Sequence, residues 1–236
     1  MAEAPFPPTF VINLPNRRDR LGYIKKEFAE WPVPIERVEA VQKKPGWKGC
    51  TQSHRKCIQL AYDRGYPWVL LVEDDCKLAE GAIQRFTSLL PFLWKRKEWD
   101  MFNGGMCFLN DKSVSIVSII NKETSIVNAK GDCSQFLLFP KRVFQKILAD
   151  LSPTDPIARI DQYYKDNYEQ MWTIDPFLAT QRNDRSSLSG KITRFQTWFQ
   201  QSQEALVRGL KTAKNRNRNR WKSKSKTVKN KGASQK

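Results

Sequence analysis

Three consecutive carboxylates, Glu73, Asp74 and Asp75, directly follow an apolar run at 68–72. Such a run is typical of a strand buried on both faces, and open α/β sheets bind ligands beyond the carboxyl ends of their strands. Neighbouring acids repel one another, and Mg²⁺ or Mn²⁺ relieves this by binding their oxygens while sharing its other positions with a substrate's phosphates. The pattern therefore favours a site for a metal and a nucleotide diphosphate. The alternative is a solvated acidic turn in which Asp75 caps the next helix.

Polar and basic side chains also follow the first predicted strand, at 9–14. Asn13 ends this strand, and Arg17 and Arg20 lie just beyond it. Arginine matches phosphate oxygens with two parallel hydrogen bonds, so these residues are candidates to hold a nucleoside or its pyrophosphate. The alternative for the two arginines is the solvated start of a helix.

The order of the predicted elements places these residues on one sheet. Apolar periodicity predicts strand, helix, strand, helix and strand through residue 72, which argues for a parallel sheet of the nucleotide-binding kind. Short strands separated by polar residues follow, and they indicate a mixed or antiparallel portion. The predicted strands are 9–14, 35–41, 68–72, 99–102, 114–120, 125–128, 136–139 and 171–174. The predicted helices are 16–28, 51–63, 79–93, 141–151 and 158–168.

The positive charge of the chain is concentrated in its last part. Of the formal net charge of +17, residues 191–236 carry +13, from fourteen Lys or Arg against the single acid Glu204, which leaves +4 for the rest. The expected division is an N-terminal extension at 1–8, one domain at 9–190, an amphipathic helix at 191–210 and a disordered basic tail at 211–236. The tail would bind an anionic membrane surface or nucleic acid. A nucleic-acid-binding protein with a non-catalytic core is therefore the alternative class of function.

The five cysteines show neither a Cys-x-x-Cys pair nor the spacing of a secreted disulfide framework, which suggests a reducing compartment. The first residues do not resemble a signal peptide, and no stretch reaches the roughly 18 apolar residues of a transmembrane helix. We therefore expect a cytoplasmic protein that can be peripheral to a membrane, and the alternative is a mature form that has lost a targeting segment. Cys50, His54, Cys57 and Cys76 invite a zinc site, but their spacing fits no familiar zinc motif and favours packing as small apolar residues.

Several short motifs in a fixed order resemble glycosyltransferase family 25, the lipooligosaccharide and procollagen galactosyltransferases. The resemblance covers roughly residues 9–190 and leaves the tail outside. The ordered co-occurrence of the motifs is more specific than any one of them. They are Val-Ile-Asn-Leu at 11–14 with Arg17 and Arg20, Glu-Ala-Val at 39–41, Gly49-Cys50 followed by Ser53-His54, the acids 73–75 and Trp99-Asp100, with weaker echoes at Ile160-Asp161 and 176–187.

The resemblance implies a GT-A fold and the inverting transfer of a hexose, galactose foremost, from a UDP-sugar donor to a hydroxyl of a glycan or of hydroxylysine. It also implies Mn²⁺, or Mg²⁺ in its place, bound by Glu73 and Asp75 in the acidic motif. Asp161 is the candidate base that takes the proton of the acceptor hydroxyl, and a helix cap or surface acid is the alternative role for it.

Two departures from the family pattern concern the metal and the acceptor. The segment between Val41 and Gly49 is shorter than in many relatives, which reduces an acceptor-facing loop. His54 is the single histidine, so no histidine near the C-terminus can complete the metal shell, and Asp184 is the candidate third ligand. The expected donor contacts are Asn13, Arg17, Arg20, Ser53, His54 and Asp74, and the alternative role for Ser53 and His54 is to order the metal loop.

Overall fold

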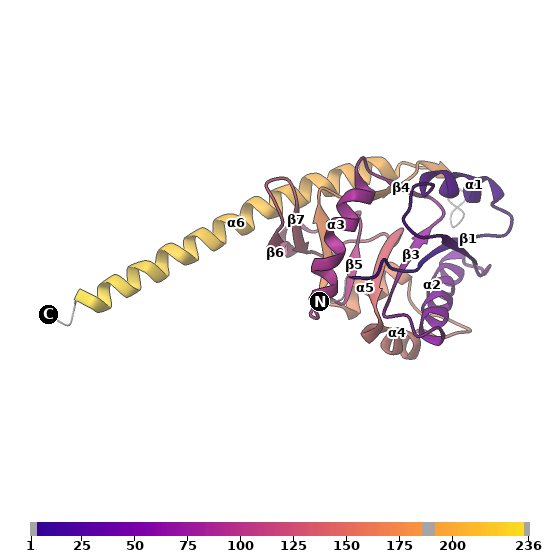
Figure 1. The fold of residues 1–236 in the computed structure, drawn as a ribbon, viewed down its shortest axis with the longest axis horizontal. Coiled ribbons are helices and arrows are strands. Elements are labelled where there is room, and N and C mark those ends of the chain that lie inside the picture. Colours follow the sequence, from indigo (N-terminus) through magenta and orange to yellow (C-terminus); the bar gives the residue numbers. More distant parts are fainter. Residues whose placement is uncertain (1–3, 186–191, 234–236) are drawn as a thin grey trace.

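An eight-stranded mixed sheet with the strand order β2-β1-β3-β8-β5-β9-β7-β6 forms the centre of the molecule (Figure 1). The structure is a computed structural model that describes residues 4–185 and 192–233. Helices pack on both faces of this sheet, and each face has its own hydrophobic core. The predicted α/β class with a mixed sheet is confirmed.

The parallel part of the sheet consists of β1 (Thr9–Asn13), β2 (Ile35–Glu39) and β3 (Trp68–Glu73), as predicted. β1 lies between the other two strands. In the register, Asn13 is opposite Glu39, and Ile12 is opposite Glu73. The carboxyl ends of the three strands therefore meet at one edge, where the acidic turn follows β3.

The remaining strands make up the mixed portion that the sequence also predicts. β8 (Phe136–Pro140) runs antiparallel to β3 and to β5 (Met101–Asn103). β9 (Met171–Asp175) is parallel to β5, and β7 (Ser125–Asn128) pairs with β9 and with β6 (Ser115–Ile119) in antiparallel fashion. Four of these strands are buried on both faces over most of their length, and β6 at the edge is more exposed.

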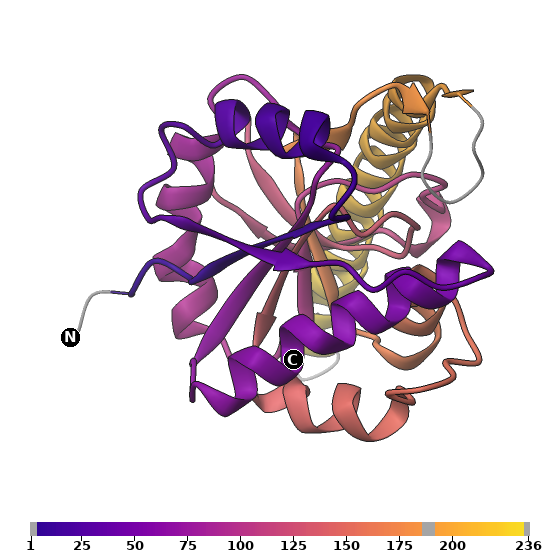
Figure 2. The ribbon, with the colours of Figure 1, turned by 90° about the vertical axis from the view of Figure 1, so that its right-hand side faces the viewer.

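Helices α1 (Arg18–Glu27) and α3 (Ala82–Lys95) cover one face of the sheet (Figure 2). Helices α2 (Gly46–Asp63), α4 (Phe144–Asp150) and α5 (Ile160–Asn167) cover the other face. Alternate side chains of β3 enter the two cores, which explains why this strand is apolar throughout. Two short 3₁₀ helices, η1 (Asp111–Ser113) and η2 (Lys141–Val143), complete the helical elements of the described chain.

Four short strands lie beside the main sheet. β4 (Cys76–Leu78) pairs antiparallel with β10 (Ala179–Gln181), and β11 (Asp184–Arg185) pairs with β12 (Ile192–Thr193). None of the four was predicted, because two or three residues are too few to show a period of two. β10 packs so tightly on Gly105 that a Cβ there would lie 1.9 Å from the Ala179 carbonyl oxygen. The pairing with β4 and the bond from the Arg182 amide to the Asp75 carbonyl hold β10 beside the acidic turn.

Helix α6 (Phe195–Ala233) begins on the body of the molecule and then extends away from it (Figure 1). Phe199, Leu206 and Leu210 are buried on the same face of the sheet as α2. The apolar side of this helix therefore faces the protein. The sequence predicts its end near 210, whereas the helix continues to Ala233. Lys and Arg have good helix propensity, so a basic sequence can continue a helix that packing has nucleated.

A disulfide joins Cys107 and Cys133, which lie 26 residues apart in the sequence. The prediction that the cysteines indicate a reducing compartment did not foresee this pair, because a spacing of that kind resembles no disulfide framework. Cys50, Cys57 and Cys76 are free. Within the described part of the chain, no helix has both the length and the apolar character needed to cross a bilayer.

Candidate active site

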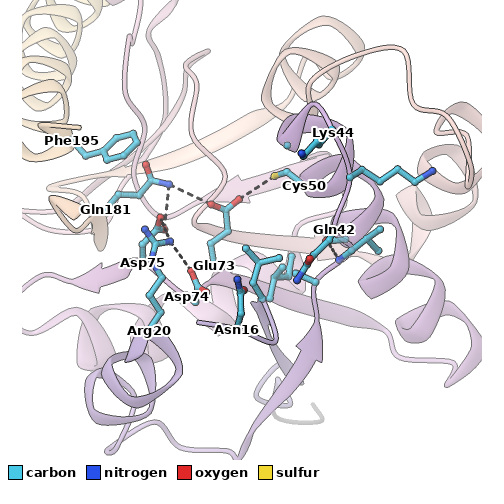
Figure 3. A pocket seen from close by; sticks show the side chains of 17 residues that line it. Asn16, Arg20, Gln42, Lys44, Cys50, Glu73, Asp74, Asp75, Gln181 and Phe195 are labelled. Atoms are coloured by element: carbon cyan, nitrogen blue, oxygen red, sulfur yellow. Dashed lines mark hydrogen bonds and ion pairs between the residues drawn. The ribbon is translucent and has the colours of Figure 1, made fainter. Parts of the chain in front are cut away.

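A cavity of 660 Å³ opens at the edge where β1, β2 and β3 end (Figure 3). Its size is typical of pockets that enclose a small organic ligand, and its place agrees with the rule for open α/β sheets. The segment 40–46, the start of α2, β10 and the first residue of α6 complete its walls. Described residues that line it are Ile12, Leu14, Asn16, Arg20, Ala40, Val41, Gln42, Lys43, Lys44, Gly46, Cys50, Ser53, Glu73, Asp74, Asp75, Gln181 and Phe195.

Glu73, the last residue of β3, is held by neighbours on several elements. Its Oε1 accepts a hydrogen bond from the Ser134 hydroxyl at 2.7 Å and lies 3.1 Å from His54 Nε2, with the Cys50 thiol 3.9 Å away. Burial alone would raise the pKa of Glu73, but the bonds with His54 and Ser134 hold that pKa below its ordinary value. Glu73 is therefore a fixed, negatively charged carboxylate at neutral pH.

Asp75 lies in the turn after β3 and behaves differently. Its Oδ2 accepts a hydrogen bond from Arg20 Nη1 at 3.0 Å. Burial, and next the negative charge of Glu73, raise the pKa of Asp75 from 3.8 to about 7, and Arg20 offsets only part of this. Asp75 therefore keeps its proton to near neutral pH, and a cation bound beside it would displace that proton.

Arg20 links the remaining acids to α1. It is 5% exposed, its Nη1 donates to Asp74 Oδ1 at 2.9 Å as well as to Asp75, and its Nε donates to Asp184 Oδ2 at 3.0 Å. The sequence predicts Arg20 as a contact for the donor nucleotide. The structure places its guanidinium on three carboxylates at the wall of the cavity, where it offsets part of their charge.

Asp74 is oriented from β1. Asn13 Nδ2 donates to Asp74 Oδ2 at 2.8 Å, and Arg37 Nε donates to Asn13 Oδ1 at 2.9 Å. Burial raises the pKa of Asp74, although Arg20 and Asn13 oppose the shift. Asn13 is 1% exposed, so its observed role is to position Asp74, which itself lines the cavity.

Asp184, the predicted third metal ligand, lies between two guanidinium groups. Arg17 Nη2 and Arg20 Nε each lie 3.0 Å from Asp184 Oδ2. Arg17 also pairs with Asp19 at the start of α1. Among the described residues that line the cavity, Arg20 is present and Arg17 and Asp184 are not. Asp184 is thus paired with Arg17 and Arg20 beside the cavity. The role of Arg17 in binding the donor stays a prediction.

Ser53 and His54 lie on α2, as predicted, but at different depths. The Ser53 hydroxyl donates to the Gly49 carbonyl at 2.7 Å and accepts from the Val41 amide at 2.8 Å, which ties the segment 40–46 to the helix. A Cβ at Gly49 would lie 2.3 Å from the Val41 carbonyl oxygen, so glycine permits this approach. His54 is fully buried behind Glu73 and orients that carboxylate.

Of the four residues considered for a zinc site, only Cys50 and His54 lie close together. Cys57 and Cys76 are buried in the two hydrophobic cores, as expected for small apolar side chains. The ligand atoms of Cys50, His54 and Glu73 do lie within 4.8 Å of one another. Burial, and next the charge of Glu73, raise the pKa of the Cys50 thiol well above its ordinary value, which opposes the thiolate that zinc requires. This cluster therefore serves to hold Glu73 by hydrogen bonds.

Asp161, the predicted catalytic base, lies at the start of α5. Its Oδ1 accepts a hydrogen bond from the Gln162 amide at 2.9 Å. An acid with a purely structural role at the start of a helix would make the same kind of bond to a free backbone amide. Burial raises the pKa of Asp161, and the charges of Asp132 and Glu73 add to this against the Gln162 bond. Asp161 therefore lies within electrostatic reach of Glu73, although it is not among the described residues lining the cavity.

The acids fit a hard divalent cation. Glu73 Oε2 and Asp75 Oδ1 lie 3.3 and 3.5 Å from a single atom, Gln181 Nε2, so two carboxylate oxygens converge on one point (Figure 3). Oxygen donors of this kind suit Mn²⁺ and Mg²⁺. Burial, and next the negative charge of Glu73, raise the pKa of Asp75, and a cation bound there would neutralise the charge that Glu73 and Asp75 bring together.

Two contributors to the site were not predicted from the sequence. Ser134 follows the disulfide-bonded Cys133 and holds Glu73, and Gln181 ends β10 and bridges Glu73 and Asp75. Ser134 belongs to none of the quoted motifs, and Gln181 lies within the weakly matching segment 176–187, where nothing singled it out. Their positions result from the pairing of strands that are distant in the sequence.

Fold and site together define a mixed α/β protein with an acidic cavity at the ends of its parallel strands. No family model matches the chain, and no curated protein matches its sequence. Among solved structures, it is similar to a glycosyltransferase involved in glycosylation of the major capsid of PBCV-1, with 10% identity, a TM-score of 0.42, and coverage of 70% of this chain and 76% of that one.

It is also similar to a mannose-1-phosphate geranyltransferase from Thermus thermophilus, with 10% identity, a TM-score of 0.45, and coverage of 73% of this chain and 75% of that one. Similarity at this level does not extend to substrates, so function is inferred below from the site itself.

Proposed function

We propose that this protein is a metal-dependent inverting glycosyltransferase that moves a hexose from a UDP-sugar to a hydroxyl of a glycan or of hydroxylysine. The observation that supports this is the pair Glu73 and Asp75, whose oxygens converge at the end of β3 on the wall of a 660 Å³ cavity. The motif resemblance supplies the donor class, with galactose as the first sugar to test.

Glu73 and Asp75 would hold Mn²⁺ or Mg²⁺, which when bound stabilises the negative charge of the departing diphosphate. His54 and Ser134 keep Glu73 ionised and fixed in orientation. Arg20 and Lys44 add positive charge to the cavity wall, which favours a diphosphate there. The segment 40–46 closes the side of the cavity opposite the acids and offers Gln42 for polar contact with the donor (Figure 3).

A screen of UDP-sugars for hydrolysis tests this proposal. Release of UDP from UDP-galactose, UDP-glucose and related donors would be measured with Mn²⁺ and with a chelator in excess. We expect turnover of at least one donor that depends on the metal. Turnover that is undiminished in the chelator, or no turnover of any UDP-sugar, would contradict the proposal.

Asp161 is proposed as the base that accepts the proton of the acceptor hydroxyl. We expect Asp161→Asn to lower sugar transfer by about 100-fold or more and to change the affinity for UDP by only a few-fold, because a base acts in the chemical step. The exposed Asp166 on the same helix provides the control Asp166→Asn, which should transfer sugar normally. If the two variants behave alike, Asp161 is a structural residue of α5.

The basic end of α6 is proposed to attach the enzyme to an anionic membrane surface. This part of the helix extends away from the body, and residues 217–236 contain eight Lys or Arg and no acid. Each basic residue near such a surface contributes about 1 kcal/mol, and salt weakens the attraction.

The test compares the full chain with one that ends at Arg216, which keeps the buried residues of α6 up to Ala213. Only the full chain should sediment with anionic vesicles, and more strongly at low salt. Equal sedimentation of both chains would contradict membrane attachment, whereas binding of nucleic acid in place of vesicles would favour the alternative partner.

A further inference from the structure

Gln181 occupies the point on which the two carboxylates converge. It is the last residue of β10, and in the register it is opposite Cys76, the residue after Asp75. The Arg182 amide donates to the Asp75 carbonyl at 2.8 Å, and Gln196 bonds to the Gln181 carbonyl from α6. The backbone of Gln181 is thus fixed relative to the acidic turn, and its buried side chain lies against the two carboxylates.

One end of the Gln181 amide has a partner and the other does not. Nε2 donates to Glu73 Oε2 at 3.3 Å and to Asp75 Oδ1 at 3.5 Å. The residue is 6% exposed, and its Oε1 is buried with no hydrogen-bond partner among the described residues. A buried amide oxygen without a partner is unfavourable by about 1–3 kcal/mol, so such atoms in folded proteins usually serve a ligand or water.

The two ends of a glutamine amide have nearly the same shape but opposite polarity. Rotation of the amide by half a turn brings Oε1 to the place of Nε2, beside the two carboxylate oxygens. The oxygens of Glu73, Asp75 and Gln181 would then surround the space between them. A divalent cation in that space would repel the NH₂ group and attract the carbonyl, so binding itself favours the rotation.

We propose that Gln181 is the third protein ligand of the divalent cation, through Oε1, and that its NH₂ group holds the two carboxylates together when the cation is absent. This inference rests on the metal dependence in the proposed function. It replaces Asp184 in the ligand set, because Asp184 Oδ2 lies between Arg17 and Arg20. The single histidine is engaged with Glu73, so the chain completes its metal shell with an amide.

The test is Mn²⁺ binding to the full-length protein without nucleotide, measured by the loss of the free Mn²⁺ signal in electron paramagnetic resonance. Gln181→Leu should weaken Mn²⁺ binding by about 10-fold or more, since even outer residues of metal sites change affinity by that factor. Gln181→Glu should bind at least as tightly as the wild type, because it supplies a charged oxygen in the same place.

Gln52→Leu is the matched control. Gln52 is also 6% exposed with a buried, unpartnered Oε1, but its amide bonds to the Pro153 carbonyl and not to an acid. Its Mn²⁺ affinity should stay within a few-fold of the wild type. If Gln181→Leu does not fold, Gln181→Glu and Gln181→Asn provide the test. The Asn side chain is one methylene too short to reach the cation, so Gln181→Asn should bind Mn²⁺ more weakly than the wild type.

Equal Mn²⁺ affinity of Gln181→Leu and Gln52→Leu would overturn the inference. A loss confined to Asp184→Asn would overturn it in favour of Asp184, and failure of the wild type to bind Mn²⁺ would overturn both the ligand set and the metal dependence. A failure of the proposed function itself is distinguishable, because Mn²⁺ binding would then depend on Gln181 while no UDP-sugar is turned over.

Discussion

Asp75→Asn should abolish metal-dependent turnover of UDP-sugar, with a loss of about 10³-fold or more. In the proposed function, a metal held by Glu73 and Asp75 would stabilise the negative charge on the departing diphosphate by several kcal/mol, and each 1.4 kcal/mol corresponds to about a factor of ten. An amide at this position keeps the size of the side chain but removes the negative charge that holds the cation. The measurement is the rate of UDP release from the best donor of the screen at saturating Mn²⁺.

The same substitution should not destabilise the fold at neutral pH. The pKa of Asp75 is about 7 in the folded protein and near 3.8 when exposed, so the folded state binds the proton more tightly. Its contribution to stability is therefore complete below about pH 4 and is lost as the pH rises through about 7. Glu73 and Asp74 repel the charged form, and Arg20 attracts it.

Urea denaturation in chelator at about pH 5 and about pH 8 measures this effect. When the pH is raised from the lower to the higher value, the free energy of unfolding of the wild type should fall more than that of Asp75→Asn. A variant that is inactive and also much less stable than wild type at the higher pH would show that Asp75 is a structural acid. Unchanged turnover would remove it from the metal site.

Arg20→Leu should lower the free energy of unfolding by about 3–5 kcal/mol at neutral pH. Arg20 is 5% exposed, and its guanidinium pairs with Asp74, Asp75 and Asp184. Removal of one partner from a buried ion pair leaves the others without compensation. Urea denaturation in chelator provides the measurement. The loss should shrink at about pH 5, where protonation of the acids reduces their repulsion.

Arg17→Leu is the control for Arg20, because it shares Asp184 but its side chain is 20% exposed against 6% for Arg20. Exposed ion pairs contribute about 0–1 kcal/mol, so this variant should lose little stability. Mn²⁺ should restore part of the loss in Arg20→Leu by neutralising the same acids. Equal and small losses in both variants would show that Arg20 is not required to compensate the carboxylates.

The sequence predicts the parts of this fold that carry strong local patterns. The runs that form β1 and β3 are buried on both faces, and an apolar run of that length has few other interpretations. The basic end of α6 was expected to be disordered because it has little apolar surface to bury. Its helix to Ala233 depends instead on nucleation by the packed residues Phe199 and Leu206, which composition alone does not reveal.

In the site, too, some residues are predicted by local sequence patterns, and others are placed only by contacts between distant segments. The acids 73–75 and Arg20 could be placed together because both follow strands whose ends meet at one edge. Gln181 could not, because β10 has three residues and its pairing with β4 joins segments about 100 residues apart in the sequence. For His54 the sequence leaves open contact with the donor or ordering of the metal loop, and only the folded chain shows that its ring lies behind Glu73.

Calorimetric titration of the protein with UDP tests the central claim most directly, namely that the cavity beside Glu73 and Asp75 binds a nucleotide diphosphate through a metal. The account predicts that UDP binds wild type in Mn²⁺, that binding is weakened at least about tenfold in chelator, and that Asp75→Asn binds weakly under both conditions. Binding of UDP that is equally tight with Mn²⁺ and with chelator, or no binding in either, would contradict it.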